Sequence, residues 1–165
     1  MKPSTALLIL LLSAAAFSAA AENPTACDAL TRADVKAVQG SAFAETKHTQ
    51  SQFDGIAISQ CFYRLPSFVD SISVDVIRSS SMNAEELWQK ITGKRIAKMN
   101  AKGREAGDTI PNLGDAAIWA GNKNAGAMYV LQGTALLRIS VGGGGTEEEK
   151  IEKTRALAAR ALANL

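Results

Sequence analysis

The chain has 165 residues, with 18 lysines and arginines against 16 aspartates and glutamates, so its formal net charge is only +2. This length fits one domain that can bury a core. The near-balance of charge provides no general attraction for nucleic acid or another polyanion, so we expect no nucleic-acid partner.

The N-terminal segment, residues 1–21, has the pattern of a cleaved secretory signal peptide. Lys2 supplies the positive start, residues 6–17 form an apolar run, and small residues follow. An N-terminal membrane anchor is one alternative, but an apolar run of about 12 residues is short of the roughly 20 that span a bilayer. Lipid attachment at Cys27 is a second alternative, although Pro24 stands where such a motif carries leucine.

The remainder, residues 22–165, is then expected to be a single globular domain in the periplasm or the medium, with no transmembrane segment. Its two cysteines, Cys27 and Cys61, are an even number in an exported chain, which predicts one disulfide. A reactive or metal-binding thiol pair is the alternative, but their spacing is unlike that of a redox Cys-x-x-Cys motif.

The predicted elements begin with a short helix. Thr31 followed by Asp34 is a capping-box pattern, and Gly40 is a typical residue after a helix end. Residues 41–52 are polar and weakly patterned, which fits either an edge strand or an extended loop. Asp54-Gly55 then predicts a tight turn.

Two strands and a helix are predicted next. Residues 56–65 form the first strand. Residues 71–78 form the second, because Ile72, Val74 and Val76 alternate with polar residues. Further along, the pattern predicts a helix over 84–102, strands over 116–120, 127–132 and 134–141, and a last helix that opens at Thr146. The order predicts an α+β domain with an antiparallel sheet of about five strands, three helices and one disulfide.

Four segments carry a resemblance to a known family. They are Cys-Asp-Ala-Leu-Thr at 27–31, Cys-Phe-Tyr at 61–63, Ile-Pro-Asn-Leu-Gly-Asp-Ala-Ala-Ile-Trp at 110–119, and residues 131–141 before the closing Ala/Leu helix. The chain resembles a group of uncharacterised bacterial secreted proteins and lipoproteins, common in actinobacteria, several of which are thought to share a PsbP-like α/β/α sandwich. The resemblance implies a non-enzymatic envelope domain that binds a ligand or a protein. Many of these relatives carry a lipid-attachment motif, which this chain lacks.

A search for catalytic or metal-binding patterns finds none with the required context. The single histidine, His48, lies in a polar stretch, whereas a metal site needs several converging ligands, so we expect no metal and no cofactor. No Gly-x-Ser-x-Gly motif supports a Ser-His-Asp triad. The glycines at 142–145 precede glutamates instead of the Lys-Ser/Thr of a phosphate-binding loop.

Two features remain as candidate binding sites. Trp119, just after the Pro111 loop, is a candidate to line a groove, with a place in the core as the alternative. A run of basic residues without aromatic neighbours is a candidate surface for an anionic partner, with an ordinary solvated helix face as the alternative. The members of this basic run are Lys90, Lys94, Arg95, Lys98, Lys102 and Arg104.

These observations predict an exported, non-catalytic domain that binds an envelope protein or a small ligand. The alternative from a different class is an enzyme, such as a hydrolase of envelope material, whose site has no recognisable motif.

Overall fold

The computed structural model describes residues 23–100 and 109–165. The predicted signal peptide and two basic residues, Lys102 and Arg104, therefore lie outside the described residues. In chain order the elements are α1 (Arg32–Gln39), β1 (Glu45–Phe53), β2 (Ile56–Arg64), the 3-10 turn η1 (Phe68–Asp70), β3 (Ile72–Ser79), α2 (Ala84–Asn100), β4 (Ala116–Gly121), β5 (Gly126–Gln132), β6 (Ala135–Val141) and α3 (Glu147–Ala163).

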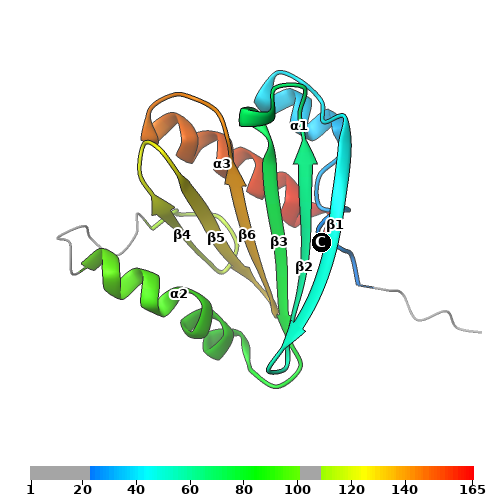
Figure 1. The fold of residues 1–165 in the computed structure, drawn as a ribbon. Helices are drawn as coiled ribbons and strands as arrows, with labels where there is room; N and C mark the ends of the chain where they lie inside the picture. The colour runs from blue at the N-terminus through cyan, green and yellow to red at the C-terminus, as the bar shows by residue number, and fades with distance from the viewer. Residues whose placement is uncertain (1–22, 101–108) are drawn as a thin grey trace, which may run out of the picture.

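The six strands form one antiparallel sheet in the order β1-β2-β3-β6-β5-β4. Each half of the sheet is a run of consecutive strands, and the two runs meet where β6 pairs with β3 (Figure 1). At this seam Val74 lies opposite Ile139, and on its other side Val74 lies opposite Cys61. After β3 the chain passes through α2 to the far edge of the sheet before it returns to the centre.

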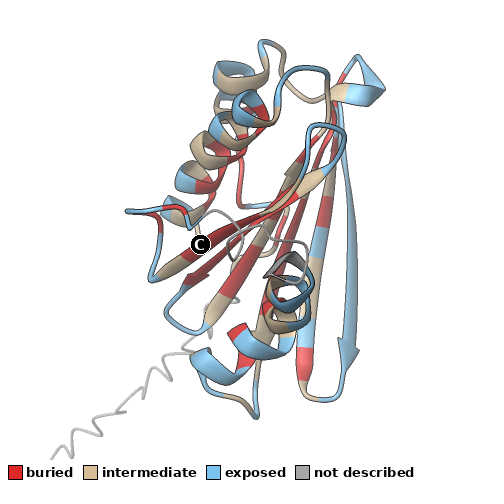
Figure 2. Cartoon of the chain, turned by 90° about the vertical axis from the view of Figure 1, so that its left-hand side faces the viewer, coloured by how far each residue is buried: buried red, intermediate tan, exposed pale blue. Residues whose placement is uncertain are grey.

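Helices cover both faces of the sheet. α3 packs on β5, β6 and α1, and α2 packs on β4, β5 and β6. The strands alternate accordingly, so that Val74, Val76 and Ile139 belong to the core under α1 and α3, whereas Ile77 and Leu136 belong to the core under α2. Figure 2 shows the buried residues running along the strands between these layers. The α+β class and the three helices are therefore confirmed.

Local sequence explains where the helices begin. Thr31 accepts a hydrogen bond from the backbone N–H of Asp34, whose carboxylate accepts one from the Thr31 N–H in return. Thr146 and Glu149 form the same reciprocal pair at the start of α3. Gly40 ends α1 with φ at 82°, a conformation that costs glycine little.

The predicted disulfide between Cys27 and Cys61 is present. It ties the segment before α1 to the centre of β2. Nearby, the buried Tyr63 hydroxyl donates to the Ala26 carbonyl at 2.6 Å and accepts from the Leu30 N–H at 3.3 Å. The N-terminal segment is thus held to the sheet by one covalent bond and by hydrogen bonds that are shielded from water.

The predicted strand count of about five is wrong, because the sheet has six strands. The additional strand is β1, of which all but the last residue lies within residues 41–52, the segment that the sequence left open as a strand or a loop. All nine of its residues are exposed. This strand is defined by its backbone pairing with β2. Because none of its side chains is buried, the sequence shows no alternation of apolar residues that would have predicted it. Within the described residues, no helix is both long enough and apolar enough to cross a membrane.

Candidate functional site

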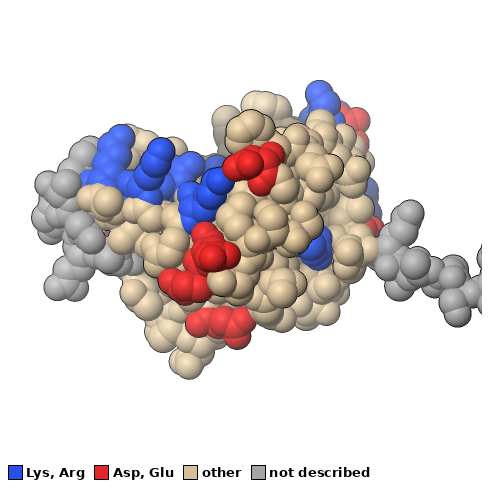
Figure 3. Space-filling view, turned by 90° about the horizontal axis from the view of Figure 1, so that it is seen from below, with Lys and Arg blue, Asp and Glu red and all other residues tan. Residues whose placement is uncertain are grey.

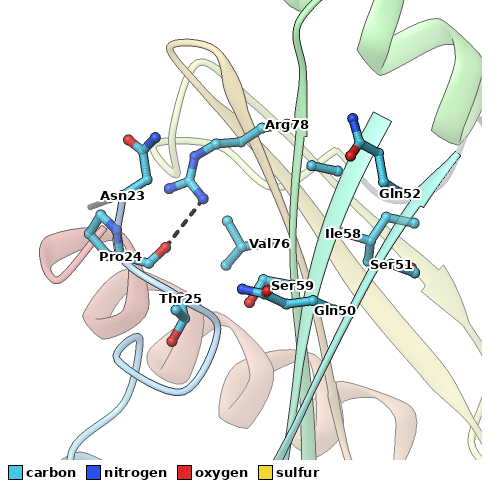
Figure 4. Close-up of a pocket in the computed structure, with 11 residues that line it drawn as sticks. Asn23, Pro24, Thr25, Gln50, Ser51, Gln52, Ile58, Ser59, Val76 and Arg78 are labelled. Atoms are coloured by element: carbon cyan, nitrogen blue, oxygen red, sulfur yellow. Dashed lines mark hydrogen bonds between the residues drawn. The ribbon is translucent and has the colours of Figure 1, made fainter. Parts of the chain in front are cut away.

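Two adjoining hollows open on the face of the sheet that carries α1 and α3, at the end where β1 and β3 finish. The first has a volume of about 410 Å³ and lies between residues 23–25, the end of β1 and the inward side of β2 and β3 (Figure 4). The second, of about 340 Å³, lies between the β5–β6 turn and the C-terminal end of α3. Both volumes are in the range of small-molecule sites. Asn23 and Arg78 line both hollows.

Arg78 is positioned by the alternation of β3, which places it two residues after the buried Val76 on the same face. Its side chain extends toward residues 23–24, where Nη1 donates to the Pro24 carbonyl at 3.3 Å (Figure 4). This is the one hydrogen bond of the Arg78 side chain within the described residues. Partial burial lowers the pKa of Arg78, because it removes water from the charged form.

The remaining lining residues differ in polarity between the two hollows. Gln50 and Gln52 provide amides around the first hollow and Ser59 provides a hydroxyl, over a floor that includes Val76. The second hollow has aliphatic side chains from Leu137, Leu162 and others. Among the residues that line either hollow, none is an aspartate or a glutamate. Arg78 is therefore the one charged side chain among the residues that line the two hollows.

A serine and the single histidine meet at the wall of the first hollow. Ser59 Oγ lies 2.9 Å from Nε2 of His48, and it also accepts a 2.9 Å hydrogen bond from the Ala26 N–H. Asp28 lies near His48. Its pKa is lowered mainly by the hydrogen bonds that it accepts from the side chain and backbone of Thr25, and His48 adds a smaller effect in the same direction. Within the described chain, no ion pair or hydrogen bond joins Asp28 to His48.

The opposite face of the sheet holds a second polar cluster. Asp75 is only 8% exposed, and its two oxygens accept from Gln60 Nε2 at 2.8 Å and from Arg138 Nη1 at 3.0 Å. Both carboxylate oxygens of Asp75 thus have a hydrogen-bond donor, and Arg138 also supplies the opposite charge. The charges of Asp75 and Arg138 therefore offset each other within the fold, and no net charge is left for a charged ligand to match.

The four members of the basic run that the structure describes are all exposed on α2: Lys90, Lys94, Arg95 and Lys98. Lys90 is paired with Asp54 at 2.8 Å, and the guanidinium of Arg95 lies 5.3 Å from the centre of the Tyr129 ring in the core under α2. Figure 3 shows basic side chains over the region of α2 with acidic side chains beside them.

Trp119 lies in the core and not in a groove, which corrects the interpretation of it as a binding residue. It is 1% exposed, and its indole Nε1 donates to Glu147 Oε1 at 3.0 Å. The ring packs against Gly121 and Gly126, where a Cβ would leave no room for it. Its position follows from the alternation of β4, which turns Trp119 toward α3.

The two hollows were not predicted from the sequence, although one signal for Arg78 was present. Ile72, Val74 and Val76 face the core, so the next residue in this alternation, Arg78, must also point inward. An arginine in an inward position at a strand end is an unusual placement for a charge. Nothing in the sequence indicated that residues 23–25 fold back over it.

Fold and site together define a small, disulfide-linked α+β domain with a ligand-sized recess that contains one arginine side chain. No group of three or more potential metal ligands occurs within residues 23–100 and 109–165. Comparisons with family models, curated proteins and solved structures found no match to this chain.

Proposed function

We propose that this chain is an exported, non-catalytic domain that binds a small ligand in the cell envelope, in the periplasm or outside the cell. The observation that carries the proposal is the pair of adjoining hollows, which share Arg78 and have volumes of about 410 and 340 Å³. The disulfide supports export, because such bonds persist in oxidising compartments. A partner protein remains the second kind of ligand, for which the exposed Lys94 and Lys98 are the candidate contacts.

We also propose that this chain belongs to the family of secreted bacterial proteins that it resembles, and that it shares their PsbP-like fold. The resemblance to secreted bacterial proteins with a PsbP-like sandwich is supported by the layering, with α1 and α3 on one face of an antiparallel sheet and α2 on the other. Fold alone assigns no ligand, so the site has to carry the function.

The test of the proposal is the native mass of the oxidised protein purified gently from its own envelope fraction, compared with its mass after denaturation. A retained ligand would add a mass that denaturation removes, and that increment would start to identify the ligand. A bare native mass, combined with no response to any member of a metabolite library in thermal unfolding, would contradict the proposal.

A hydrolase is the second candidate function, and one observation favours it. The 2.9 Å contact between Ser59 Oγ and His48 Nε2 is the distance at which a histidine accepts the proton of a nucleophilic serine. Binding is the better-supported function because Ser59 already accepts a hydrogen bond from the Ala26 N–H, and because Asp28 is engaged by Thr25 instead of orienting His48.

A serine-reactive fluorophosphonate probe separates the two functions. Labelling that maps to Ser59, is lost in Ser59→Ala and His48→Gln, and is kept in Ser51→Ala would support the hydrolase. Ser51 is the control because it is a serine of the neighbouring strand that lies opposite Ile58, on the other face of the sheet from Ser59. Absence of labelling under conditions that label a known serine hydrolase would reject it.

A further inference from the structure

We infer that the ligand of the two hollows carries an oxyanion, a carboxylate or a phosphate, which binds to the guanidinium of Arg78. The inference rests on the proposed function and names the chemical class of the ligand. It adds that the anion sits at the junction of the hollows, where Arg78 lines both, so that the rest of the ligand extends into one hollow or the other.

The first argument is the unmatched charge. Arg78 is partly buried, and no acidic side chain lines either hollow. The main-chain carboxylate of Leu165 belongs to the lining of the second hollow, but within the described residues it forms no ion pair with Arg78. Burying a cation without a counter-charge costs free energy, which an anion at this position would recover. The other partly buried arginine on a neighbouring strand, Arg138, shows the contrast, because Asp75 pairs with it at 3.0 Å.

The second argument is the number of available donors. A guanidinium carries five N–H donors in a planar fork, which suits two parallel hydrogen bonds to a carboxylate or a phosphate. Arg78 uses one of them, in a long 3.3 Å bond to the Pro24 carbonyl. Figure 4 shows its side chain held extended between β3 and residues 23–24, so that an arriving anion would meet an already oriented group.

The third argument concerns what would accompany the anion. The first hollow presents the amides of Gln50 and Gln52, which suit hydroxyl or amide groups on a ligand. The second hollow presents Leu162 and Leu165, which suit a short apolar group. A sugar acid and a short fatty acid are therefore matched probes for the two sides.

The experiment is a titration of the isotope-labelled, oxidised protein, followed by NMR at the Arg78 Nε–H and at the backbone amides of the hollows. The probes are gluconate against glucose, hexanoate against hexanamide, and inorganic phosphate. Each charged probe differs from its neutral partner chiefly in charge, so the pairs isolate the anion. Phosphate against the carboxylates distinguishes the two kinds of oxyanion.

We expect an anion to shift the Arg78 resonance and to bind at least tenfold more tightly than its neutral partner, since a charge-assisted hydrogen bond contributes about one such factor. Added salt should weaken this binding. The Arg78→Gln protein should bind the charged and the neutral probe equally, and the Arg78→Lys protein should retain part of the preference for the charged probe. Arg64→Gln is the matched control, because Arg64 is an arginine of β2 whose side chain pairs with Glu45 on the other face of the sheet.

Three results would overturn the inference. Equal binding of charged and neutral probes would do so, as would unchanged anion binding by a folded Arg78→Gln protein, and both would leave the proposed function standing with a ligand of another class. Shifts from no probe at either hollow would overturn the inference and count against the proposed function as well.

Discussion

Removal of the Cys27–Cys61 disulfide should cost this domain a large part of its stability. The two residues are 34 apart in sequence, and a cross-link of that span restricts the unfolded chain by about 4 kcal/mol at 25 °C in the chain-entropy relation. Domains of this size unfold with a net free energy of about 5–15 kcal/mol. The loss should therefore lower Tm by about 10 °C.

The assay is urea unfolding of the oxidised protein, of the protein reduced with a thiol reductant, and of the Cys27→Ala/Cys61→Ala variant. The reduced protein isolates the cross-link because it keeps both side chains. The double variant adds the smaller cost of a space at Cys61, which is fully buried. The slope m should rise on reduction, because the open chain exposes more surface when it unfolds.

The same change should also weaken ligand binding. Residues 23–25 form one wall of the first hollow and are tethered to β2 through Cys27. A difference between oxidised and reduced protein of less than about 1 kcal/mol would refute the estimate, which is about four times larger. Unchanged binding after reduction would show that the hydrogen bonds of Tyr63 suffice to hold this wall.

Three further predictions test the packing and the titration of the fold. Tyr63→Phe leaves two buried backbone groups without the hydroxyl that joins them, so it should cost about 1–3 kcal/mol in urea unfolding; an unchanged midpoint would contradict this. Gly126→Ala drives a methyl group into the adjacent indole ring and should cost about 1–3 kcal/mol, whereas Gly144→Ala has open space around its Cβ; equal losses in the two variants would refute the packing argument. Hydrogen bonds from the side chain of Thr31 lower the pKa of Asp34 from 3.8, so its contribution is present above that value and is lost as pH falls through the lowered pKa. Unfolding free energy measured against pH should therefore fall less steeply on the acid side in Asp34→Asn, and identical slopes would show that Asp34 contributes nothing.

The elements that the sequence predicted well are those whose local chemistry agrees with their burial. The capping boxes at Thr31 and Thr146 located the starts of α1 and α3 because their side chains bond to backbone groups three residues away. The alternation of Ile72, Val74 and Val76 located β3, since one side of that strand is in the core. Patterns of this kind involve only neighbouring residues, so they can be recognised without knowing which distant parts of the chain pack together.

The elements that the sequence missed depend on partners far along the chain. β1 has no buried face, so only its register with β2, in which His48 lies opposite Cys61, makes it a strand. The recess at Arg78 is built by residues 23–25 from one end of the chain and by Leu162 and Leu165 from the other. Side chains that are brought together only by the completed fold leave no spacing pattern to detect.

The seam between β3 and β6 has a consequence for the route by which the domain folds. Within each half of the sheet the strands pair with their sequence neighbours, β1 with β2 and β2 with β3, and then β4 with β5 and β5 with β6. The pairing of β3 with β6 is the exception, because Val74 and Ile139 are separated in sequence by α2 and two strands. Local pairings form before distant ones because their loops are less costly to close. We therefore expect the two three-strand sheets to form early and the seam to close late, which measurement of φ-values on its two sides would reveal. Both cysteines belong to the first half, so oxidation can complete that half while the second is still unfolded.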